Sequence, residues 1–462
     1  MEEEFELIAK TFMGLEPVLA QELKEIGAHD VRPGRRMVSF RWNKEGMYRA
    51  NVMLRTAIRI LKPIRHFKAK DADDVYKAVQ QVNWDEIILS GKTFAVDSVV
   101  YSEDFRNSRF VTYKVKDAIV DQLREKRGTR PNISITNPDI RLHIHIADDD
   151  ATLCLDSSGE SLHKRGYRQE SVAAPINEIL AAGIILLTGW HGECDFIDPM
   201  CGSGTFLLEA ALIARNIAPG VFRKEFAFEK WTDFDADLFD KVYNDDSLER
   251  DFTHHIYGYD IDMKAVNTAR LNARAAGLVK NITVEQRDFK DFTRPAEKSI
   301  IVTNPPYGER ISTPDLLGTY KMIGERLKKE FAGNDAWIIS YREECFNQIG
   351  LKPSIKIPLY NGSLECELRR YTLFDGKLDN FMRNGGTVKT DEEKKAMAEK
   401  HRFKKNRQFK QGISDEDADD ARDHMKQRNR LKRKYEFKQR RMEEEENEEG
   451  DIRSFKFHPF KK

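Results

Sequence analysis

The chain has 462 residues, with 77 acidic and 77 basic side chains, and 33% of its residues are charged. This length exceeds one ordinary core and predicts two or three domains, while the zero net charge means that any basic binding surface must be local. The five scattered cysteines lack a CxxC pair, which speaks against a zinc ribbon or a disulfide framework. The acidic start "MEEEFELIAK" carries no signal-peptide pattern and no apolar run is long enough for a bilayer, so we expect a soluble cytoplasmic protein without a metal.

The first 155 or so residues mix short strands with amphipathic helices. Val111, Val115, Ile119 and Leu123 recur on one face of a predicted helix, which Gly128 is placed to end. The following stretch "IRLHIHIADDDATLCLD" alternates apolar and polar residues around an Asp-rich turn, which predicts a β-hairpin.

Four cations lie near the start of that helix: Arg106, Arg109, Lys114 and Lys116. Positive charge at a helix N-terminus opposes the helix dipole, so something should compensate it. A nucleic-acid phosphate backbone is one candidate, and ordinary solvated surface charge is an equal alternative.

From Asp195 to about Leu373 strands alternate with helices, which predicts a mostly parallel, doubly wound sheet. Asp262 is a plausible helix N-cap, Gly277 a plausible stop, and Thr313 with Pro314 a plausible entry to the next helix. The predicted strands are "DFIDP", "HIYGYDI", "NITVEQRD", "SIIVTNPPYG" and "DAWIISY", and the pair in "SIKIPLYNGSLECELRRYTL" forms an antiparallel edge hairpin. Ligands of such folds bind at the carboxyl ends of the strands.

The last segment, from about Lys377, consists of blocks of like charge with few aliphatic residues. Such a segment cannot bury enough apolar surface to fold alone, so a solvated tail or a lone charged helix is expected. A basic arm that binds RNA, over Lys426 to Arg441, is the alternative.

A glycine-containing turn follows the first of these strands in "DPMCGSGTFLLEAA". Gly202 and Gly204 allow a ligand close to the backbone and to free N–H groups of the next helix. No lysine precedes Thr205 as a phosphate-binding Walker loop requires, and Leu207 replaces the third glycine of a dinucleotide fingerprint. Asp198 can accept from an ammonium while N–H groups receive a carboxylate, and S-adenosylmethionine carries both.

Two further acidic residues stand at predicted strand ends. Asp260 can accept from both ribose hydroxyls, although an insertion must then separate it from the glycines. Its alternative role as a helix cap suits Asp262 better. Asp288 can accept from an adenine amino group, and a surface turn residue is the alternative at nearly even odds.

The stretch "IVTNPPYGER" ends a β-branched strand on an amide, two prolines and a tyrosine. An exocyclic amine is a poor nucleophile because its lone pair is delocalised. Asn304 Oδ1 and the carbonyl of Pro305 can accept from its two N–H groups, and proline supplies no competing donor. Tyr307 can stack on a planar base. An ordinary Pro-Pro turn that ends an edge strand is the less favoured interpretation.

With "TNPPYGER" and "DPMCGSGTFLLEAA", the chain resembles class I S-adenosylmethionine-dependent methyltransferases that act on guanine N2 of RNA, above all the RlmL-type 23S ribosomal RNA enzymes. The stretch "LDSSGESLHKRGYRQESVAAPINEILAAGIILLTGW" resembles the segment between a THUMP domain and that catalytic domain. The resemblance covers residues 1 to about 380. It implies a ferredoxin-like part (1–60), a THUMP RNA-binding domain (61–155), a linker and flank (156–194), a Rossmann-like class I methyltransferase domain (195–376) and the charged tail (377–462).

The resemblance also implies roles for individual residues. The flank would lie over the cofactor, shaped by Pro175. Asn361 and Gly362 would place a hairpin turn near the substrate, and a plain turn is an equal alternative. S-adenosyl-L-methionine would be bound by Asp198, Cys201, Gly202, Gly204, Thr205, Asp260 and Asp288, the target base by Asn304, Pro305, Pro306 and Tyr307, and RNA by Arg106, Arg109, Lys114 and Lys116.

We therefore expect an enzyme that methylates guanosine N2 in 23S ribosomal RNA or in a large-subunit assembly intermediate. Some relatives carry a second methyltransferase domain, so a single modification is expected here. The NPPY motif is shared with adenine-N6 and glutamine-N5 methyltransferases and does not choose the amine. Alternatives are a transfer RNA guanine-N2 methyltransferase, a DNA adenine methyltransferase, and a non-catalytic RNA-binding or ribosome-assembly factor.

Overall fold

The computed structural model describes residues 3–105, 107–172, 175–308, 315–374, 376 and 383, all within one compact unit of the chain. Arg106, Thr313, Pro314 and nearly all of the charged tail lie outside the described residues. The strands are β1 (Phe5–Lys10), β2 (His29–Gly34), β3 (Met37–Trp42), β4 (Arg59–Lys68), β5 (Thr93–Tyr101), β6 (Asn132–Ile133), β7 (Ile140–Ala147), β8 (Asp150–Asp156), β9 (Asp195–Asp198), β10 (Ile256–Asp260), β11 (Ile282–Gln286), β12 (Ser299–Thr303), β13 (Asp335–Ser340), β14 (Ile355–Asn361) and β15 (Leu364–Thr372).

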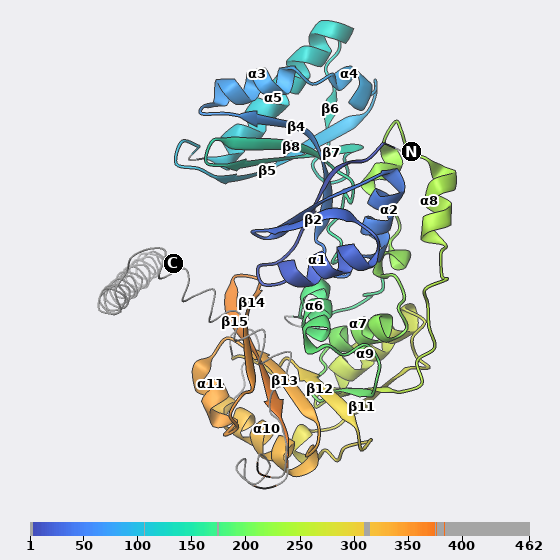
Figure 1. Cartoon of the computed structure of the whole chain (residues 1–462), viewed down its shortest axis with the longest axis vertical. Coiled ribbons are helices and arrows are strands. Elements are labelled where there is room, and N and C mark those ends of the chain that lie inside the picture. The colour runs from blue at the N-terminus through green and yellow to red at the C-terminus, as the bar shows by residue number, and fades with distance from the viewer. Residues whose placement is uncertain are drawn as a thin grey trace, which may run out of the picture. The chain divides into compact units, whose positions relative to one another are not determined.

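The helices alternate with these strands (Figure 1). No helix in the described ranges is both long and apolar enough to cross a membrane. The α-helices are α1 (Glu16–Glu25), α2 (Lys44–Met53), α3 (Ala72–Gln80), α4 (Trp84–Ile87), α5 (Ser108–Arg127), α6 (Glu178–Thr188), α7 (Thr205–Ala214), α8 (Ala236–Tyr243), α9 (Met263–Ala275), α10 (Leu316–Glu330) and α11 (Glu343–Gln348), and the 3-10 helices are η1 (Pro219–Phe222), η2 (Ala227–Lys230) and η3 (Phe289–Asp291).

The N-terminal strands share one sheet, in which β4 joins two subdomains. Among the described residues its strand order is β2-β3-β1-β4-β8-β7-β5-β6. Strand β4 pairs antiparallel with β1 at one end and with β8 along its length. The register shifts between Pro63 and Arg65, where proline has no N–H to donate. The ferredoxin-like elements and the following α+β elements are therefore continuous through one strand.

The local predictions for the second subdomain are confirmed. Helix α5 buries Val111, Val115, Ile119 and Leu123, and Gly128 ends it in the left-handed region with φ of 69°. Strands β7 and β8 pair antiparallel as the predicted hairpin.

The second sheet has the expected doubly wound topology. In the described part of the chain its order is β11-β10-β9-β12-β13-β15-β14. Strands β11 to β13 in this order are parallel, while β15 and β14 are antiparallel at the edge, as predicted. The order reverses between β9 and β12, and this topological switch point is where such sheets bind ligands.

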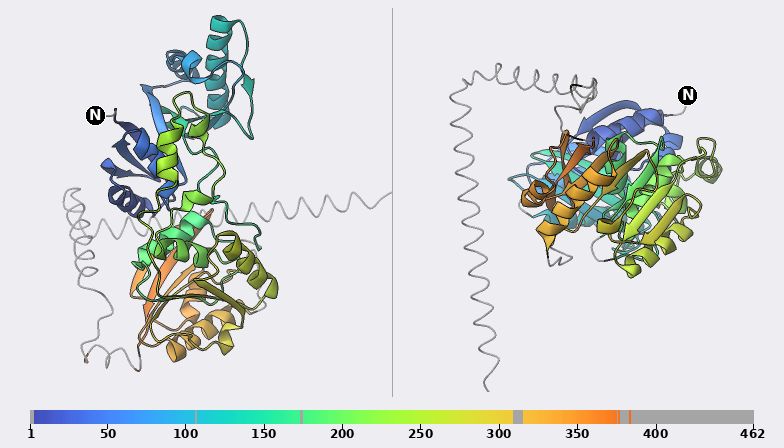
Figure 2. Two further views of the ribbon diagram at one scale, coloured as in Figure 1. Left: turned by 90° about the vertical axis from the view of Figure 1, so that its right-hand side faces the viewer. Right: turned by 90° about the horizontal axis from the view of Figure 1, so that it is seen from below.

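Helices cover both faces of this sheet (Figures 1 and 2). Successive side chains of a strand point to opposite faces. Accordingly, Phe196 of β9 packs in the core below α6, α7 and α9, whereas Ile197 packs in the core below α10 and α11. Because both of its faces are buried, the central strand β12 is buried along its whole length, which explains why "IIV" does not alternate with polar residues.

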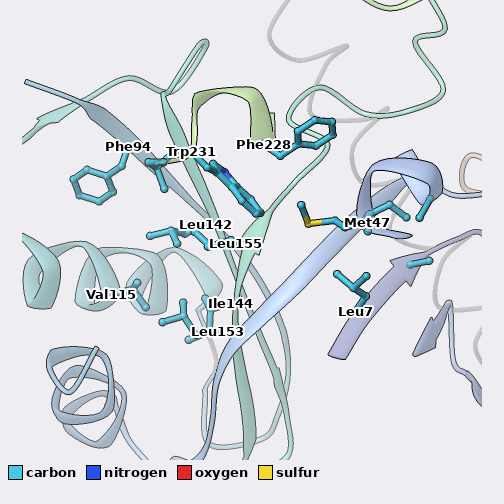
Figure 3. Packing of buried hydrophobic residues seen from close by; sticks show 14 of the residues in the cluster. Leu7, Met47, Phe94, Val115, Leu142, Ile144, Leu153, Leu155, Phe228 and Trp231 are labelled. Atoms are coloured by element: carbon cyan, nitrogen blue, oxygen red, sulfur yellow. The ribbon is translucent and has the colours of Figure 1, made fainter. Parts of the chain in front are cut away.

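Residues 215–255, between α7 and β10, form the insertion that the sequence required, and their largest aromatic cluster packs against the N-terminal sheet rather than the second one. Phe226, Phe228 and Trp231 are buried in the N-terminal core. The Tyr48 ring of α2 lies 4.5 Å from that of Phe228, and Figure 3 shows Phe228 and Trp231 among the labelled residues of this core. The insertion therefore fastens the second sheet's domain to the N-terminal subdomains.

One helix start differs from the prediction. The sequence suggested entry to α10 through Thr313 and Pro314, but the helix begins at Leu316 and Asp315 is its N-cap. The Asp315 carboxylate accepts from the Gly318 N–H at 2.8 Å. Asp is a better N-cap than Thr, so the local rule was applied two residues too early.

Candidate active site

A cavity of about 730 Å³ lies at the carboxyl ends of β9, β10 and β12, at the switch point of the sheet. Segments far apart in the sequence meet there: the glycine turn, the residues after β10 and β11, the NPPY turn, the start of α10 and the β14–β15 turn. Every predicted cofactor and base-binding residue except Gly204 lines it, namely Asp198, Cys201, Gly202, Thr205, Asp260, Asp288, Asn304, Pro305, Pro306 and Tyr307.

Gly204 stands behind the cavity as the N-cap of α7, with φ of 82°. A Cβ on Gly204 would lie 3.0 Å from the Ala269 Cβ of α9. The residue therefore allows a left-handed turn and a close approach of two helices, and Gly202, with φ of 52°, makes the turn on the cavity side.

We expect Gly204→Ala to lower the free energy of unfolding by about 2 kcal/mol, since a left-handed L-residue costs roughly 1–2 kcal/mol and the helices must also separate. Urea unfolding measures this. Gly277→Ala is the matched control, because Gly277 also has positive φ, of 68°, but no atom lies within 4 Å of an added Cβ. Equal losses in the two variants would contradict the proposed crowding between α7 and α9.

Asp198 is a buried carboxyl without a cationic partner among the described residues. It is 1% exposed and accepts from the Thr303 hydroxyl at 2.8 Å and from the Met200 N–H at 3.1 Å. Burial raises its pKa to about 7, the neighbouring Asp260 carboxyl adds to the rise, and the two neutral donors oppose it. Such a group is ready to pair with a cation that enters the cavity.

Asp260 links the end of β10 to the glycine turn. One carboxylate oxygen accepts from the Gly202 N–H at 2.9 Å and the other from the Asp262 N–H at 2.9 Å. Burial raises its pKa. As the sequence indicated, the helix cap itself is Asp262, whose side chain accepts from the Lys264 N–H. These two hydrogen bonds hold the Asp260 carboxylate at the cavity wall.

Asp288 has a structural partner as well as a place in the lining. Its carboxylate caps η3 by accepting from the Lys290 N–H at 3.0 Å, and Lys290 Nζ lies 3.0 Å away. Asp288 is therefore both a turn residue that caps η3 and a residue of the cavity wall.

All four residues of the NPPY turn line the same cavity. The Tyr307 hydroxyl donates to Asn304 Oδ1, and the Tyr307 ring packs edge-on against Tyr341 at 5.5 Å. An amide oxygen has two lone pairs, so Asn304 can accept a second donor. No donor among the described residues reaches the Pro305 carbonyl, which can therefore accept as well. The structure thus shows Tyr307 restraining Asn304, a contact that the stacking prediction did not include.

The flank before α6 closes one wall of the cavity with Val172, Pro175 and Ile176. Arg168 fastens this flank to the glycine turn. Its guanidinium donates to the Ser203 hydroxyl at 3.0 Å and the Thr205 hydroxyl at 2.9 Å, and it pairs with Glu178 at 2.7 Å.

Asn272 of α9 also holds the flank against the glycine turn, and the sequence did not indicate this role. This 1% exposed amide accepts from the Gln169 N–H at 2.9 Å and donates to the Ser203 carbonyl at 3.1 Å. A glutamate that opens an otherwise apolar helix, "EILAAGIILL", was a signal for the Arg168 contact. An asparagine inside a helix gives no comparable signal.

The predicted RNA-binding cations lie apart from this cavity, and none of the described ones lines it. Arg109 is exposed on the first turn of α5, Lys114 Nζ lies 3.4 Å from the Asp73 carboxylate, and Lys116 Nζ lies 4.7 Å from the Tyr113 ring centre. Asp73 thus partly compensates the charge at this helix start. Arg106 lies outside the described residues. In the described residues no group of histidine, cysteine or acidic side chains could hold a metal.

Comparisons with known proteins agree with this geometry. Residues 165–370 match a family model described as RMKL-like methyltransferase domain, residues 69–156 a THUMP domain and residues 6–61 an RlmL ferredoxin-like domain. The chain is 38% identical to the "Putative RNA methyltransferase slr0064" of Synechocystis, over 78% of this chain and 95% of that protein. The chain belongs to the RMKL-like methyltransferase family. The predicted fold class and family are thereby confirmed.

Other members of the family are longer. The ribosomal RNA large subunit methyltransferase K/L of Syntrophotalea carbinolica is 41% identical over 78% of this chain but only 52% of its own length. The Vibrio campbellii protein of the same name is 38% identical over 80% of this chain and 54% of its own. The chain thus spans about half the length of these curated relatives.

A solved member of the family shows which cofactor belongs to the fold. SMU.472, "a putative methyltransferase complexed with SAH", is 33% identical, with a TM-score of 0.73 over 82% of this chain and all of that one. S-adenosylmethionine is the methyl donor of the family, as the sequence predicted. The residues present here fit it, because Asp198 offers a buried acceptor that has no cationic partner in the part of the chain that the structure describes.

Proposed function

We propose that this protein transfers a methyl group from S-adenosylmethionine to the N2 amine of a guanosine in 23S ribosomal RNA. The observation that carries the proposal is one cavity that is lined both by Asp198 and Asp260 and by Asn304 and Pro305. A cationic donor and a neutral exocyclic amine can therefore meet at the switch point of the sheet.

The assigned residues position the reacting amine. Asn304 Oδ1 and the Pro305 carbonyl accept from the two N–H groups, which turns the nitrogen lone pair toward the donor. When bound, the donor supplies an electrophilic methyl group and leaves as a neutral thioether, and the methylated nitrogen becomes neutral again by releasing one proton to solvent. Tyr307 holds Asn304 in place through its hydroxyl. On this proposal Asp198 accepts from the donor's ammonium, the Asp260 carboxylate from its ribose, and Asp288 from its adenine amino group.

The RNA part of the proposal rests on the relatives and on the N-terminal region. The two K/L relatives carry large-subunit ribosomal RNA in their names, and the Synechocystis relative carries RNA. The THUMP match covers residues 69–156. We assign RNA affinity to this region, with Arg109, Lys114 and Lys116 as candidate contacts, because cations on a surface helix supply phosphate binding.

One relative favours a different amine. A solved Listeria monocytogenes protein described as "a predicted N6-adenine-specific DNA methylase" is 32% identical over 80% of this chain, with a TM-score of 0.72. Because the NPPY turn serves amines of several kinds, adenine N6 in DNA is the second candidate function.

Nucleoside mass mapping tests the proposal. Digests of 23S ribosomal RNA, transfer RNA and DNA from a deletion strain are compared with those of its parent and of a strain complemented with Asn304→Ala. We expect one N2-methylguanosine in 23S ribosomal RNA to be present only in the parent. Its persistence in the deletion strain, or loss of a transfer RNA or DNA methylation instead, would assign a different substrate.

A further inference from the structure

A second, larger cavity of about 1260 Å³ lies beside the active site and is lined mainly by polar side chains. Four parts of the chain contribute to it: Arg59 of β4, residues 136–141 around the start of β7, residues 158–171 and 175–178 before and at the start of α6, and the insertion at 222–230. We call it the basic groove. Its volume exceeds the roughly 300–1,000 Å³ of small-molecule sites, so an extended ligand fits it better than a metabolite.

The basic groove concentrates positive charge on a chain whose net charge is zero. Three glutamates face eight lysines and arginines in its lining, namely Arg59, Arg141, Lys164, Arg165, Arg168, Arg223, Lys224 and Lys230. A cleft lined by one sign of charge focuses the potential and attracts the opposite charge.

Not all of these cations are cancelled by carboxylates. Arg223 donates to the main-chain carbonyls of Ser161, Lys164 and Glu160, which are neutral acceptors, and within the described ranges it has no ion pair. Burial lowers its pKa to about 10, so it stays charged at neutral pH. Lys224 is exposed and makes no ion pair with a described residue. The other six cations form ion pairs: Arg59 with Asp156, Arg141 with Asp97, Lys164 with Glu160, Arg165 with Glu209, Arg168 with Glu178 and Lys230 with Glu225. Of these, Lys164 remains 57% exposed, so a phosphate can still reach its ammonium.

The basic groove adjoins the active-site cavity. Pro175 and Ile176 line both. Arg168 lines the groove while its guanidinium holds Ser203 and Thr205 of the glycine turn. A polynucleotide in the basic groove is therefore separated from the active-site cavity only by the flank that contains Pro175 and Ile176.

We infer that the basic groove binds the phosphate backbone of the RNA on the approach to the target base, an inference that rests on the proposed function. The other lining groups, including Ser158, Ser161, Thr136 and Asn137, are of the kinds that contact phosphates. A docking site for an acidic protein would need an apolar centre, whereas Phe226 of the groove is 1% exposed and belongs to the N-terminal core.

Charge reversal at two exposed positions tests this. The double variant Lys164→Glu/Lys224→Glu changes two exposed side chains, and the one ion pair that it removes, between Lys164 and Glu160, is itself exposed. The control, Lys280→Glu/Lys352→Glu, makes the same charge change at exposed lysines near the amino ends of β11 and β14, at the edge of the sheet opposite the cavity. Binding of the full-length variants to a 23S ribosomal RNA transcript is measured between 50 and 300 mM salt, with the affinity for S-adenosylhomocysteine as a second measurement.

We expect the groove variant to bind the RNA at least tenfold more weakly, with a salt slope shallower by about 1.4, as for two lost single-strand phosphate contacts. The control should keep both values near those of the wild type, and S-adenosylhomocysteine affinity should stay unchanged in both.

Equal weakening in the two variants, or wild-type RNA binding by the groove variant, would overturn the inference. The inference would also be overturned if the groove cations proved to bind an acidic protein and not RNA. RNA binding is measured without turnover, so its result tests the basic groove even if the nucleoside mapping assigns a different target. If the groove variant bound RNA normally while the methylation map was as proposed, the inference about the groove would fail and the proposed function would stand.

Discussion

Replacing Asn304 by alanine is expected to lower kcat for RNA methylation at least about a hundredfold, with little change in donor affinity. The amide oxygen is placed to accept from the reacting amine, and losing one preorganised polar contact at a reacting centre costs about 10²–10³ in rate. Single-turnover methylation of the 23S ribosomal RNA transcript measures the chemical step. Calorimetry with S-adenosylhomocysteine measures donor binding.

Two matched variants separate the acceptor role from a packing role. Asn304→Asp keeps the shape and an acceptor, so it should retain more activity than Asn304→Ala. Tyr307→Phe keeps the ring on Tyr341 but removes the hydroxyl that restrains Asn304, so we expect a loss of less than tenfold. If alanine and aspartate at position 304 reduced turnover alike, the reaction would not depend on an accepting oxygen there.

The second sheet could be predicted from the sequence because its strands and helices alternate with clear local signals. Asp262 and Gly277 mark the ends of α9, and the apolar stretches around Ile197 and Ile301 indicate strands buried on both faces. The carboxyl ends of parallel strands share one edge of the sheet, so the sequence alone predicts that Asp198, Asp260 and Asn304 lie close together.

Side-chain contacts between segments that are far apart in the sequence could not be predicted from local sequence patterns. Nothing near Phe228 in the sequence indicates that its ring packs on Tyr48, 180 residues earlier. The same holds for Arg168 and Asn272, whose partners lie on the glycine turn. Arg168 binds the hydroxyls of the glycine turn and Asn272 its main chain, and such hydrogen bonds between distant segments leave no periodic pattern in the sequence.

The basic groove illustrates the same limit for charge. Four cations at the start of α5 are close in the sequence, which is why the sequence alone predicts RNA contacts there. The eight groove cations are spread from Arg59 to Lys230 and come together only in the fold. A net charge of zero therefore coexists with a local excess of basic side chains.

The affinity for S-adenosylmethionine is expected to rise about tenfold per pH unit below pH 7 and to level off near pH 7. Burial raises the pKa of the free Asp198 carboxyl to about 7, and pairing with the donor's ammonium requires the ionised form. At lower pH, binding must therefore release a proton. Calorimetry from pH 5.5 to 7.5, in buffers of different ionisation enthalpy, measures both the affinity and the proton released.

The free protein should show the opposite dependence in its stability. The folded pKa of Asp198 lies above the ordinary value of 3.8, so the native state binds more protons than the unfolded state between these values. Its contribution to stability is complete below about pH 4 and is lost as the pH rises to about 7. The upper bound on this loss is about 4 kcal/mol, from 1.36 kcal/mol per unit.

Asp198→Asn should remove both dependences while preserving the hydrogen bond with Thr303. We expect this variant to bind the donor weakly at every pH and to be at least as stable as the wild type at pH 8, because it no longer buries a charge. Asp260→Asn is the control, since burial raises the pKa of Asp260 as well. If the pH dependence of donor binding disappeared in Asp260→Asn and persisted in Asp198→Asn, the ammonium partner would be Asp260. The strand end of β9 would then serve only to hold Thr303 and the glycine turn.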